Sequence, residues 1–419
     1  MDLSDTNHAK VAALVNTLER QLDQQYARPH VKRDAHPKMH GCVQAILTVD
    51  HQIGHDAPDL QRGIFETPRE YLAWVRFSNA FRIQHDLELE TRGMAIKLLG
   101  VEGNRALPEG LENDREVQTQ DFLLATFDAF FIPNSSYDYR QFAAAADKGG
   151  GALIGFFVRN RLWCGLWAMF RSAFVLASNP LAITYYSQTP YRFGPLGADG
   201  RPAAIVKIRA RPLLGPALKR SLPFAFWFRL KTIAATAILS SAQSRGAAAT
   251  ERAEESCDRY LASRDLLRHA LMKTLSTTEA VFEIAVQFRS GSEASMPEDN
   301  ATKRWSEWAS PFRRVAELRI PCQVFWPEEG MPRELQGATV EMMKLGENMS
   351  FNPWHALAEH TPVGSINEMR RHIYTAIARF RRSRNAVEQP VPTVAQYRQL
   401  QEVVQFGRLV APPAQKQTV

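Results

Sequence analysis

The sequence predicts an α+β fold in which short strands form an antiparallel sheet and helices lie between and after the strands. Short runs rich in β-branched and aliphatic residues recur along the chain, as is typical of strands. Near both ends of the chain, apolar residues recur at spacings of three and four, which indicates amphipathic helices. Two long apolar stretches, broken by arginine and lysine, separate the strand-like runs and predict inserted helices.

Composition narrows the class of protein. The chain has 419 residues, of which 45% are hydrophobic and 23% charged, as in soluble globular proteins of one to three domains. The formal net charge of +7 suggests anionic surfaces or substrates, but no nucleic-acid-binding signature is present, so no nucleic-acid partner is expected. The four cysteines are scattered without a Cys-x-x-Cys pair, which argues against a zinc site and fits a reducing cytoplasm.

The first part of the chain predicts a helical arm followed by a strand. Residues 5–26 place valines and leucines on one helical stripe, which would pack on the body or on a second subunit. The start of this segment lacks the basic and then apolar order of a signal peptide. A polar segment with His36 and His40 follows, and the strand-like run 41–49 comes directly after it. A histidine at the mouth of a strand can move a proton near neutral pH.

The middle of the chain alternates predicted strands with apolar helical stretches. The stretches at 150–180 and 222–240 are interrupted by basic residues, so neither is expected to span a bilayer. We expect them to be helices packed on the strands; a lipid-like substrate channel is a second interpretation. The strand-like runs after the first one lie at 71–81, 183–194, 205–212, 281–288 and within 305–327.

The C-terminal pattern at 365–382 predicts a long helix, with Ser365 or Asn367 expected to cap its start. Arg370 and Tyr374 are four residues apart and therefore share one helical face. A guanidinium close to a phenol and away from water favours the phenolate. Phenolate is an anionic ligand for ferric iron. An Arg-x-x-x-Tyr motif is short and arises by chance in basic helices, so it gains weight only from signals elsewhere in the chain.

Such signals exist, because several short motifs occur in the order found in one known family. The segments are Arg33-x-x-His36-x-Lys38, Arg76-Phe77-Ser78, Arg92-Gly93-Met94-Ala95-Ile96-Lys97, Asp121 with Phe130-Phe131, Phe351-Asn352-Pro353, and Arg370-x-x-x-Tyr374. The Arg92–Lys97 motif is the most specific of them. Together these motifs resemble haem catalases and the smaller bacterial relatives of these enzymes.

The resemblance implies a central antiparallel eight-stranded β-barrel of catalase type, with inserted and C-terminal helices. The expected parts are an N-terminal helical arm at 1–30, a barrel domain at 31–330, a wrapping segment with the ligand helix at 331–385, and a tail at 386–419 that we expect to be loose. Helical insertions are expected near 140–180 and 215–275. The flavodoxin-like domain of the large catalases is not expected here.

The resemblance also implies haem b as the cofactor and gives several residues a role in holding it. Tyr374 would be the ligand of the ferric iron, tuned by Arg370. Arg33 and Arg76 would pair with the haem propionates, because a guanidinium fork suits a carboxylate. Phe131 would form part of the wall of the haem pocket.

The implied catalytic residues are His36, Ser78 and Thr126. His36 would take a proton from the peroxide and return it to the departing oxygen, and Ser78 would orient the imidazole. His40, four residues on, is an alternative to His36. The family carries an asparagine where this chain has Ala125 or Thr126, so an amide donor is missing and rapid dismutation of hydrogen peroxide is put in question.

The expected function is therefore a haem-dependent oxidoreductase acting on peroxides, either peroxidase-like or converting an organic or fatty-acid hydroperoxide. A haem-binding sensor or carrier without turnover is an alternative. A haem-free barrel that binds lipid is a third interpretation. The expected partner is a peroxide or lipid hydroperoxide substrate in the cytoplasm, and both peripheral membrane contact and a homo-oligomer stay open.

Overall fold

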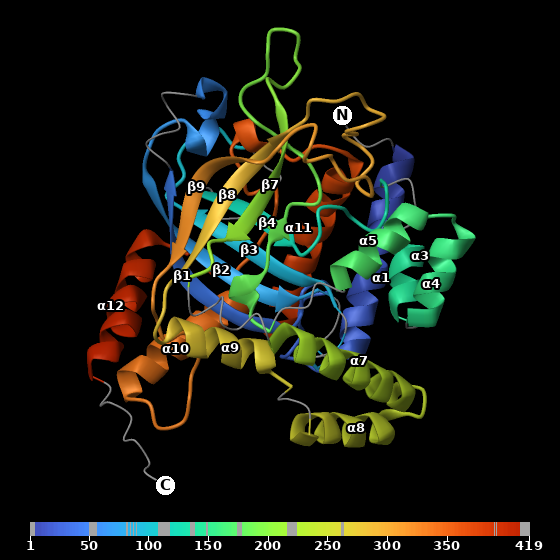
Figure 1. Cartoon of the computed structure of the whole chain (residues 1–419), viewed down its shortest axis with the longest axis vertical. Helices are drawn as coiled ribbons and strands as arrows, with labels where there is room; N and C mark the ends of the chain where they lie inside the picture. The colour runs from blue at the N-terminus through green and yellow to red at the C-terminus, as the bar shows by residue number, and fades with distance from the viewer. Residues whose placement is uncertain are drawn as a thin grey trace.

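The described strands form one closed antiparallel sheet in the computed structural model of this chain (Figure 1). Neighbouring strands follow the order β5-β4-β3-β2-β1-β9-β8-β7-β6, and an additional β5–β7 pairing closes the sheet. β5 and β6 are two residues long and both pair with β7, so they act as one interrupted strand. The predicted eight-stranded antiparallel barrel with additional helices is therefore confirmed.

The structure describes residues 5–49, 57–80, 83, 85, 86, 88, 90–107, 118–134, 139–147, 150–173, 178–215, 224–260, 264–388, 390 and 392–410. The strands are β1 Met39–Val49, β2 Glu70–Asn79, β3 Arg92–Leu99, β4 Thr119–Ala125, β5 Tyr185–Tyr186, β6 Tyr191–Arg192, β7 Ile205–Pro212, β8 Ala280–Phe288 and β9 Arg313–Ile320. The helices are α1 Asp5–Gln25, α3 Tyr139–Asp147, α4 Gly150–Arg159, α5 Trp163–Ala173, α7 Phe224–Gln243, α8 Ala247–Tyr260, α9 Leu266–Leu275, α10 Arg333–Asn348, α11 Ser365–Asn385 and α12 Val394–Val410.

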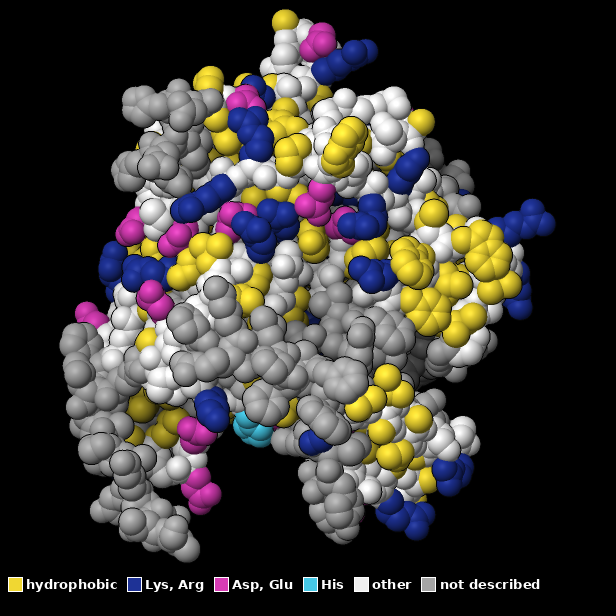
Figure 2. Space-filling model, in the orientation of Figure 1, with side chains coloured by type: hydrophobic (Ala, Val, Ile, Leu, Met, Phe, Trp, Pro, Cys, Tyr) yellow, Lys and Arg dark blue, Asp and Glu magenta, His cyan; other side chains and the backbone are white. Residues whose placement is uncertain are grey.

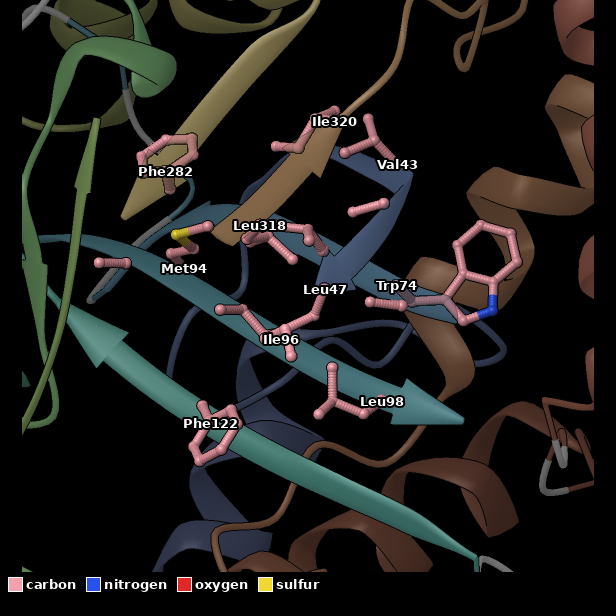
Figure 3. Close-up of a cluster of buried hydrophobic side chains, with 14 of the residues drawn as sticks. Val43, Leu47, Trp74, Met94, Ile96, Leu98, Phe122, Phe282, Leu318 and Ile320 are labelled. Atoms are coloured by element: carbon pink, nitrogen blue, oxygen red, sulfur yellow. The ribbon is translucent and has the colours of Figure 1, made fainter. Parts of the chain in front are cut away.

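The interior of the barrel is an apolar core built by alternation along the strands. Leu47 of β1, Ile96 of β3 and Leu318 of β9 have no exposed surface and point into the same space (Figure 3). Burying a side chain of this kind stabilises the fold by about 1.5–3 kcal/mol. Because successive side chains of a strand point to opposite faces, the residues between these core positions face outward and are available to build a site.

The C-terminal tail is not loose over its described part, so that expectation was wrong. Residues Tyr397, Leu400 and Val404 of α12 are buried, at spacings that put them on one helical stripe. Tyr397 packs edge-on against Trp74, which lies on the outer face of β2, and its hydroxyl donates to the carbonyl of Ala45 at 2.8 Å. This apolar stripe explains why a tail rich in proline and glutamine still docks on the barrel.

The inserted helices lie in both predicted regions, but their packing differs from the expectation. The buried residues Phe156 and Phe157 of α4 belong to a second apolar core, to which α1 and α11 contribute. Ala168 of α5 packs on Phe127 in the loop after β4, and α7 packs on α8. Helices α4, α5 and α7 therefore pack mainly on other helices and loops, whereas α9, in the second region, packs on β1 as expected (Figure 1). No helix within the described ranges has the length and apolar character needed to cross a bilayer.

Candidate functional site

The outer face of β2, β3 and β4 carries two of the predicted site residues, Arg76 and Ser78, and we call this face the strand floor. Ser78 pairs with Gly93 across β2 and β3, and Ala95 pairs with Leu123 across β3 and β4. Ala95 and Leu123 are only partly buried, although they lie in the middle of their strands. Next to Gly93, the strand floor therefore presents apolar side chains that the rest of the chain does not fully cover.

His36 lies directly on this floor and is held there by the backbone. Its φ angle of 59° is uncommon for a residue with a side chain. The backbone N–H of His36 donates to the carbonyl of Ala80 at 2.7 Å, and Nη2 of Arg76 donates to the carbonyl of His36 at 3.0 Å. Nδ1 of His36 lies 3.0 Å from Oγ of Ser78. A Cβ atom added to Gly93 would overlap Cε1 and Nδ1 of the imidazole, so only glycine leaves room for this ring.

The imidazole of His36 is kept neutral. Burial, followed by the positive charges of Arg76, Arg370 and Arg33, lowers the pKa of His36 to about 3. The imidazole is therefore uncharged at neutral pH and able to accept a proton.

His40, the alternative histidine, lies in a separate buried network. Its Nε2 lies 2.6 Å from Oδ1 of Asn79, which also accepts a hydrogen bond from Nη1 of Arg92 at 2.6 Å. The neighbouring carboxylate of Asp86 forms an ion pair with Lys38 at 2.7 Å. His40 is 1% exposed, so the two histidines have different surroundings: His36 is half-buried on the floor, and His40 is enclosed.

Three buried or half-buried arginines, the arginine cluster, converge on the last turn of α10. Nη2 of Arg33 donates to three carbonyls of residues 346–349 at distances up to 3.1 Å. Nε of Arg76 donates to one of the same carbonyls at 3.0 Å, and Arg381 donates to another. These carbonyls are the negative end of the helix dipole, which favours positive charge there. Nε of Arg33 is buried and has no hydrogen-bond partner among the described residues.

On α11, Arg370 and Tyr374 meet as their spacing predicts. Nη2 of Arg370 donates to the hydroxyl of Tyr374 at 3.3 Å. Nη1 donates to Oδ1 of Asn367 at 3.2 Å and to Oγ1 of Thr189 at 3.4 Å. Burial disfavours the charge, but the phenols of Tyr374 and Tyr191 raise the pKa of Arg370, so the guanidinium stays positive. Tyr374 itself is half-buried and keeps part of its surface accessible.

The predicted cap of α11 was wrong. The cap position is Gly364, with φ 91°, and no side chain caps the helix from that position. The backbone N–H and the hydroxyl of Ser365 both donate to the carboxylate of Asp299, at 2.7 and 2.6 Å. Asn367 is fully buried and donates instead to the carbonyls of Pro190 and Val363. A carboxylate 66 residues away in sequence thus binds the helix start, and Asn367 is free to hold Arg370.

A buried ion pair fastens the wrapping segment next to the floor. Nζ of Lys97 lies 2.8 Å from both oxygens of Asp121, and neither residue is exposed. The same carboxylate accepts the backbone N–H of Asn352 at 2.9 Å and lies 3.2 Å from Nδ1 of His355. Nε1 of Trp354 then donates to the carbonyl of Asn367 on α11 at 2.8 Å. These bonds connect the strand floor to the helix that carries Tyr374.

Two predicted site residues have contacts of another kind. The hydroxyl of Thr126 accepts the backbone N–H of Arg92 at 3.4 Å, and the residue is 3% exposed. Phe131 stacks on Phe142, with ring centroids 6.0 Å apart, in the second apolar core. The expected roles of Thr126 at a peroxide and of Phe131 at a haem pocket stay predictions.

Sequence reasoning missed Arg381 and Thr189, and it expected Asn367 to cap the helix and not to accept a hydrogen bond from Arg370. Arg381 follows Tyr374 by seven residues, which is about two helical turns, so its position on the same face was a usable signal. Asn367 precedes Arg370 by three residues and had the same kind of signal. No local pattern indicated Thr189, because it approaches Arg370 from a segment 181 residues away.

Comparison with known proteins gives a result for structure but not for sequence. No family model matches the chain, and no curated protein matches it. Among solved structures, a fungal catalase is similar with a TM-score of 0.54 and 16% identity over 90% of this chain and 64% of that chain. A bacterial catalase has a TM-score of 0.51 and 14% identity over 100% of this chain and 67% of that chain.

Catalase A from Saccharomyces cerevisiae is similar to the same degree, with a TM-score of 0.51 and 14% identity over 89% of this chain and 64% of that chain. The chain thus spans about two thirds of the length of the catalases that it matches. Likeness at this identity concerns the backbone and not the chemistry. The chain has the catalase fold, as the resemblance of its motifs predicted.

Proposed function

We propose that this chain is a haem-dependent oxidoreductase that reacts with peroxides, with haem b held between the strand floor and α11. One observation carries the proposal. Arg33, three residues before His36, and Arg381, seven residues after Tyr374 on α11, donate to the same carbonyl of Glu347, so the segment that carries His36 and the helix that carries the Arg370–Tyr374 pair meet at one point. The catalase fold is consistent with this proposal but does not establish the activity.

The described residues fit such a cofactor in three respects. Tyr374 offers a phenolic oxygen, which is a ligand suited to ferric iron, and its side chain is only half-buried. Arg33 has a buried Nε–H without a described partner, which a haem carboxylate would satisfy. The strand floor next to Gly93 consists of small or partly buried apolar residues, as a flat macrocycle requires.

When bound, ferric haem supplies the redox centre at which the O–O bond of a peroxide is cleaved. His36 would accept the proton of the bound peroxide and return it to the departing oxygen, which is general base and then general acid catalysis. Ser78 would fix the ring by its contact with Nδ1, which leaves Nε2 facing the substrate. Arg76 would hold the backbone of His36 in its strained conformation.

We favour an organic or fatty-acid hydroperoxide, or a peroxidase reaction, over the dismutation of hydrogen peroxide. The chain has Ala125 and Thr126 where the resemblance expects an asparagine, so a side-chain amide is missing. The hydroxyl of Thr126 is already bonded to the backbone of Arg92. The same observation favours the second candidate, a haem-binding sensor or carrier without turnover.

The test combines one spectrum with two assays. The purified protein is reconstituted with haem and passed through gel filtration, and we expect a ferric Soret band to survive. Tyr374→Phe should lose the band, whereas Tyr185→Phe, which changes a buried tyrosine of the barrel core, should keep it.

Turnover is then measured with hydrogen peroxide and with a fatty-acid hydroperoxide. Faster conversion of the fatty-acid hydroperoxide supports the enzyme and its substrate class. A stable band without turnover of either peroxide favours the sensor or carrier. Absence of the band in the wild-type protein contradicts both candidates.

A further inference from the structure

Two of the inserted regions expose large apolar side chains. Trp163 and Trp167 of α5 are 58% and 60% exposed. Figure 2 shows the apolar side chains as yellow areas over α5 and α7, on the same face of the molecule and next to basic side chains. We call this set the exposed apolar patch; its members are Ile154, Val158, Trp163, Trp167, Phe170, Leu230, Ile233 and Ile238.

The exposure follows the helical period and is not the by-product of a poorly packed segment. Trp163 and Trp167 are four residues apart and share one face of α5. The opposite face of α5 carries Gly165 and Ala168, which are buried. A surface helix of a globular protein normally turns its large apolar residues inward. Helix α5 packs Leu166 and Met169 on the second apolar core but exposes both tryptophans, which indicates that its outer face meets an apolar environment.

The charge of this part of the chain is unusual as well. Residues 148–250 contain 14 lysines and arginines but a single acidic residue, Asp199, so this segment has a formal charge of +13. The rest of the chain, with 37 basic and 43 acidic residues, has a formal charge of −6. The positive net charge of the protein therefore comes entirely from the segment that carries the exposed apolar patch.

The basic side chains beside the patch face solvent. Arg159, Arg161 and Arg171 are exposed, and none of them forms an ion pair with another described residue. The guanidinium of Arg171 lies 5.9 Å from the ring centroid of Trp167. Arginine next to exposed tryptophan suits the boundary between lipid headgroups and acyl chains, where an aromatic ring is half-immersed and a cation meets phosphate.

We propose that α4, α5 and α7 form a membrane-docking surface whose occupant is a bilayer rich in anionic lipid. The helices would lie on the bilayer, because none within the described ranges can span it. The charge argues against a second copy of this chain, since a two-fold symmetric contact through the patch would bring two strongly basic segments together. The proposal is independent of haem and of turnover, because it concerns only binding.

The test is co-flotation of the protein with vesicles of phosphatidylcholine alone or mixed with phosphatidylglycerol. We expect binding to the anionic vesicles only, weakening as salt is added. Trp163→Ser combined with Trp167→Ser should reduce binding about tenfold or more, because both rings enter the interface. Trp308→Ser is the matched control, since Trp308 is 97% exposed, lies outside the patch and follows Glu307.

A charge series separates electrostatic attraction from apolar insertion. Arg159→Gln combined with Arg171→Gln should weaken binding to anionic vesicles, whereas Arg333→Gln, an exposed change on α10, should not. Equal binding to both vesicle types, or wild-type binding by the tryptophan variant, would overturn the proposal. A third result would also overturn it: the protein does not bind vesicles, and light scattering shows a dimer that dissociates in the tryptophan variant. The patch would then be a contact between two copies of the chain.

Discussion

The two sides of the candidate site are built in different ways. On the strand floor, His36 is placed by its own strained backbone, by Gly93 beneath its ring and by the bond from Arg76 to its carbonyl. On α11, Arg370 and Tyr374 are placed by the period of one helix and by a side-chain bond between them. The histidine side therefore depends on several segments of chain, while the tyrosine side depends mainly on one.

This difference has a consequence for mutations. A change on the strand floor displaces His36 from the position that it occupies in the structure. The ring lies directly on Gly93 and its backbone is left-handed, so the surrounding chain has little room to adjust. A change of Arg370 on α11 leaves the helix intact and alters only the hydrogen bonds of that side chain. The effects of the following variants, if the proposed function holds, should reflect that order.

The largest effect is expected for His36→Gln. Removing the proton-accepting imidazole should lower peroxide turnover by about a hundredfold to ten-thousandfold, because general acid–base catalysis contributes that much. The Soret band should remain, since the proposed haem ligand, Tyr374, lies on α11. His40→Gln serves as the matched variant, as His40 lies in the separate network with Asn79. A greater loss of turnover in His40→Gln than in His36→Gln would reverse our assignment.

Gly93→Ala should come next. The added Cβ would overlap Cε1 and Nδ1 of His36, so the imidazole must move, and a displacement of about 1 Å can cost about a hundredfold in rate. Overpacking should also lower the free energy of unfolding by about 1–3 kcal/mol. Steady-state kinetics and urea denaturation measure the two effects.

Gly155→Ala in α4 is the control for that variant, because no heavy atom lies within 4 Å of the added Cβ. We expect unchanged turnover and a stability higher by about 0.5–1 kcal/mol, as for alanine in place of a helical glycine. Turnover of Gly93→Ala equal to that of Gly155→Ala would mean that His36 does not need its observed position.

Arg370→Lys should have a smaller effect. Lysine keeps the charge but cannot make the separate bonds to Tyr374, Asn367 and Thr189. The loss of one charge-assisted bond to the phenol should weaken haem binding about tenfold. Haem titration followed by absorbance measures it, with Arg371→Lys, the next residue on the same helix, as the comparison. Equal affinities of the two variants would show that the bond to Tyr374 is not needed.

The smallest effect is expected from pH. The neutral form of His36 is the proton acceptor, and it predominates above its pKa of about 3. Turnover should therefore not change between about pH 5 and pH 8 on account of this histidine, and should fall only as the pH approaches 3. A pH–rate profile over that range tests the expectation, and a decline in rate between pH 7 and pH 6 would contradict a neutral His36.

Much of the architecture was predictable from local patterns. Runs rich in β-branched and aliphatic residues predicted strands such as β1 and β8, and three- and four-residue spacing predicted α1 and α11. The number of strands and their closure came from the resemblance of the motifs and not from the patterns. The docked helix α12 was missed because the proline- and glutamine-rich composition around it outweighed the stripe that contains Tyr397.

The candidate site also has a part that local patterns predicted and a part that they did not. The sequence by itself determined that Arg370 and Tyr374 share a face, because helical geometry fixes neighbours four residues apart. Only the tertiary structure decided that His36 rather than His40 lies over Gly93, and that Arg33 reaches a helix end 313 residues away in sequence. Contacts of this range depend on how the closed sheet and the wrapping segment are arranged in space, and no local period of the chain encodes that arrangement.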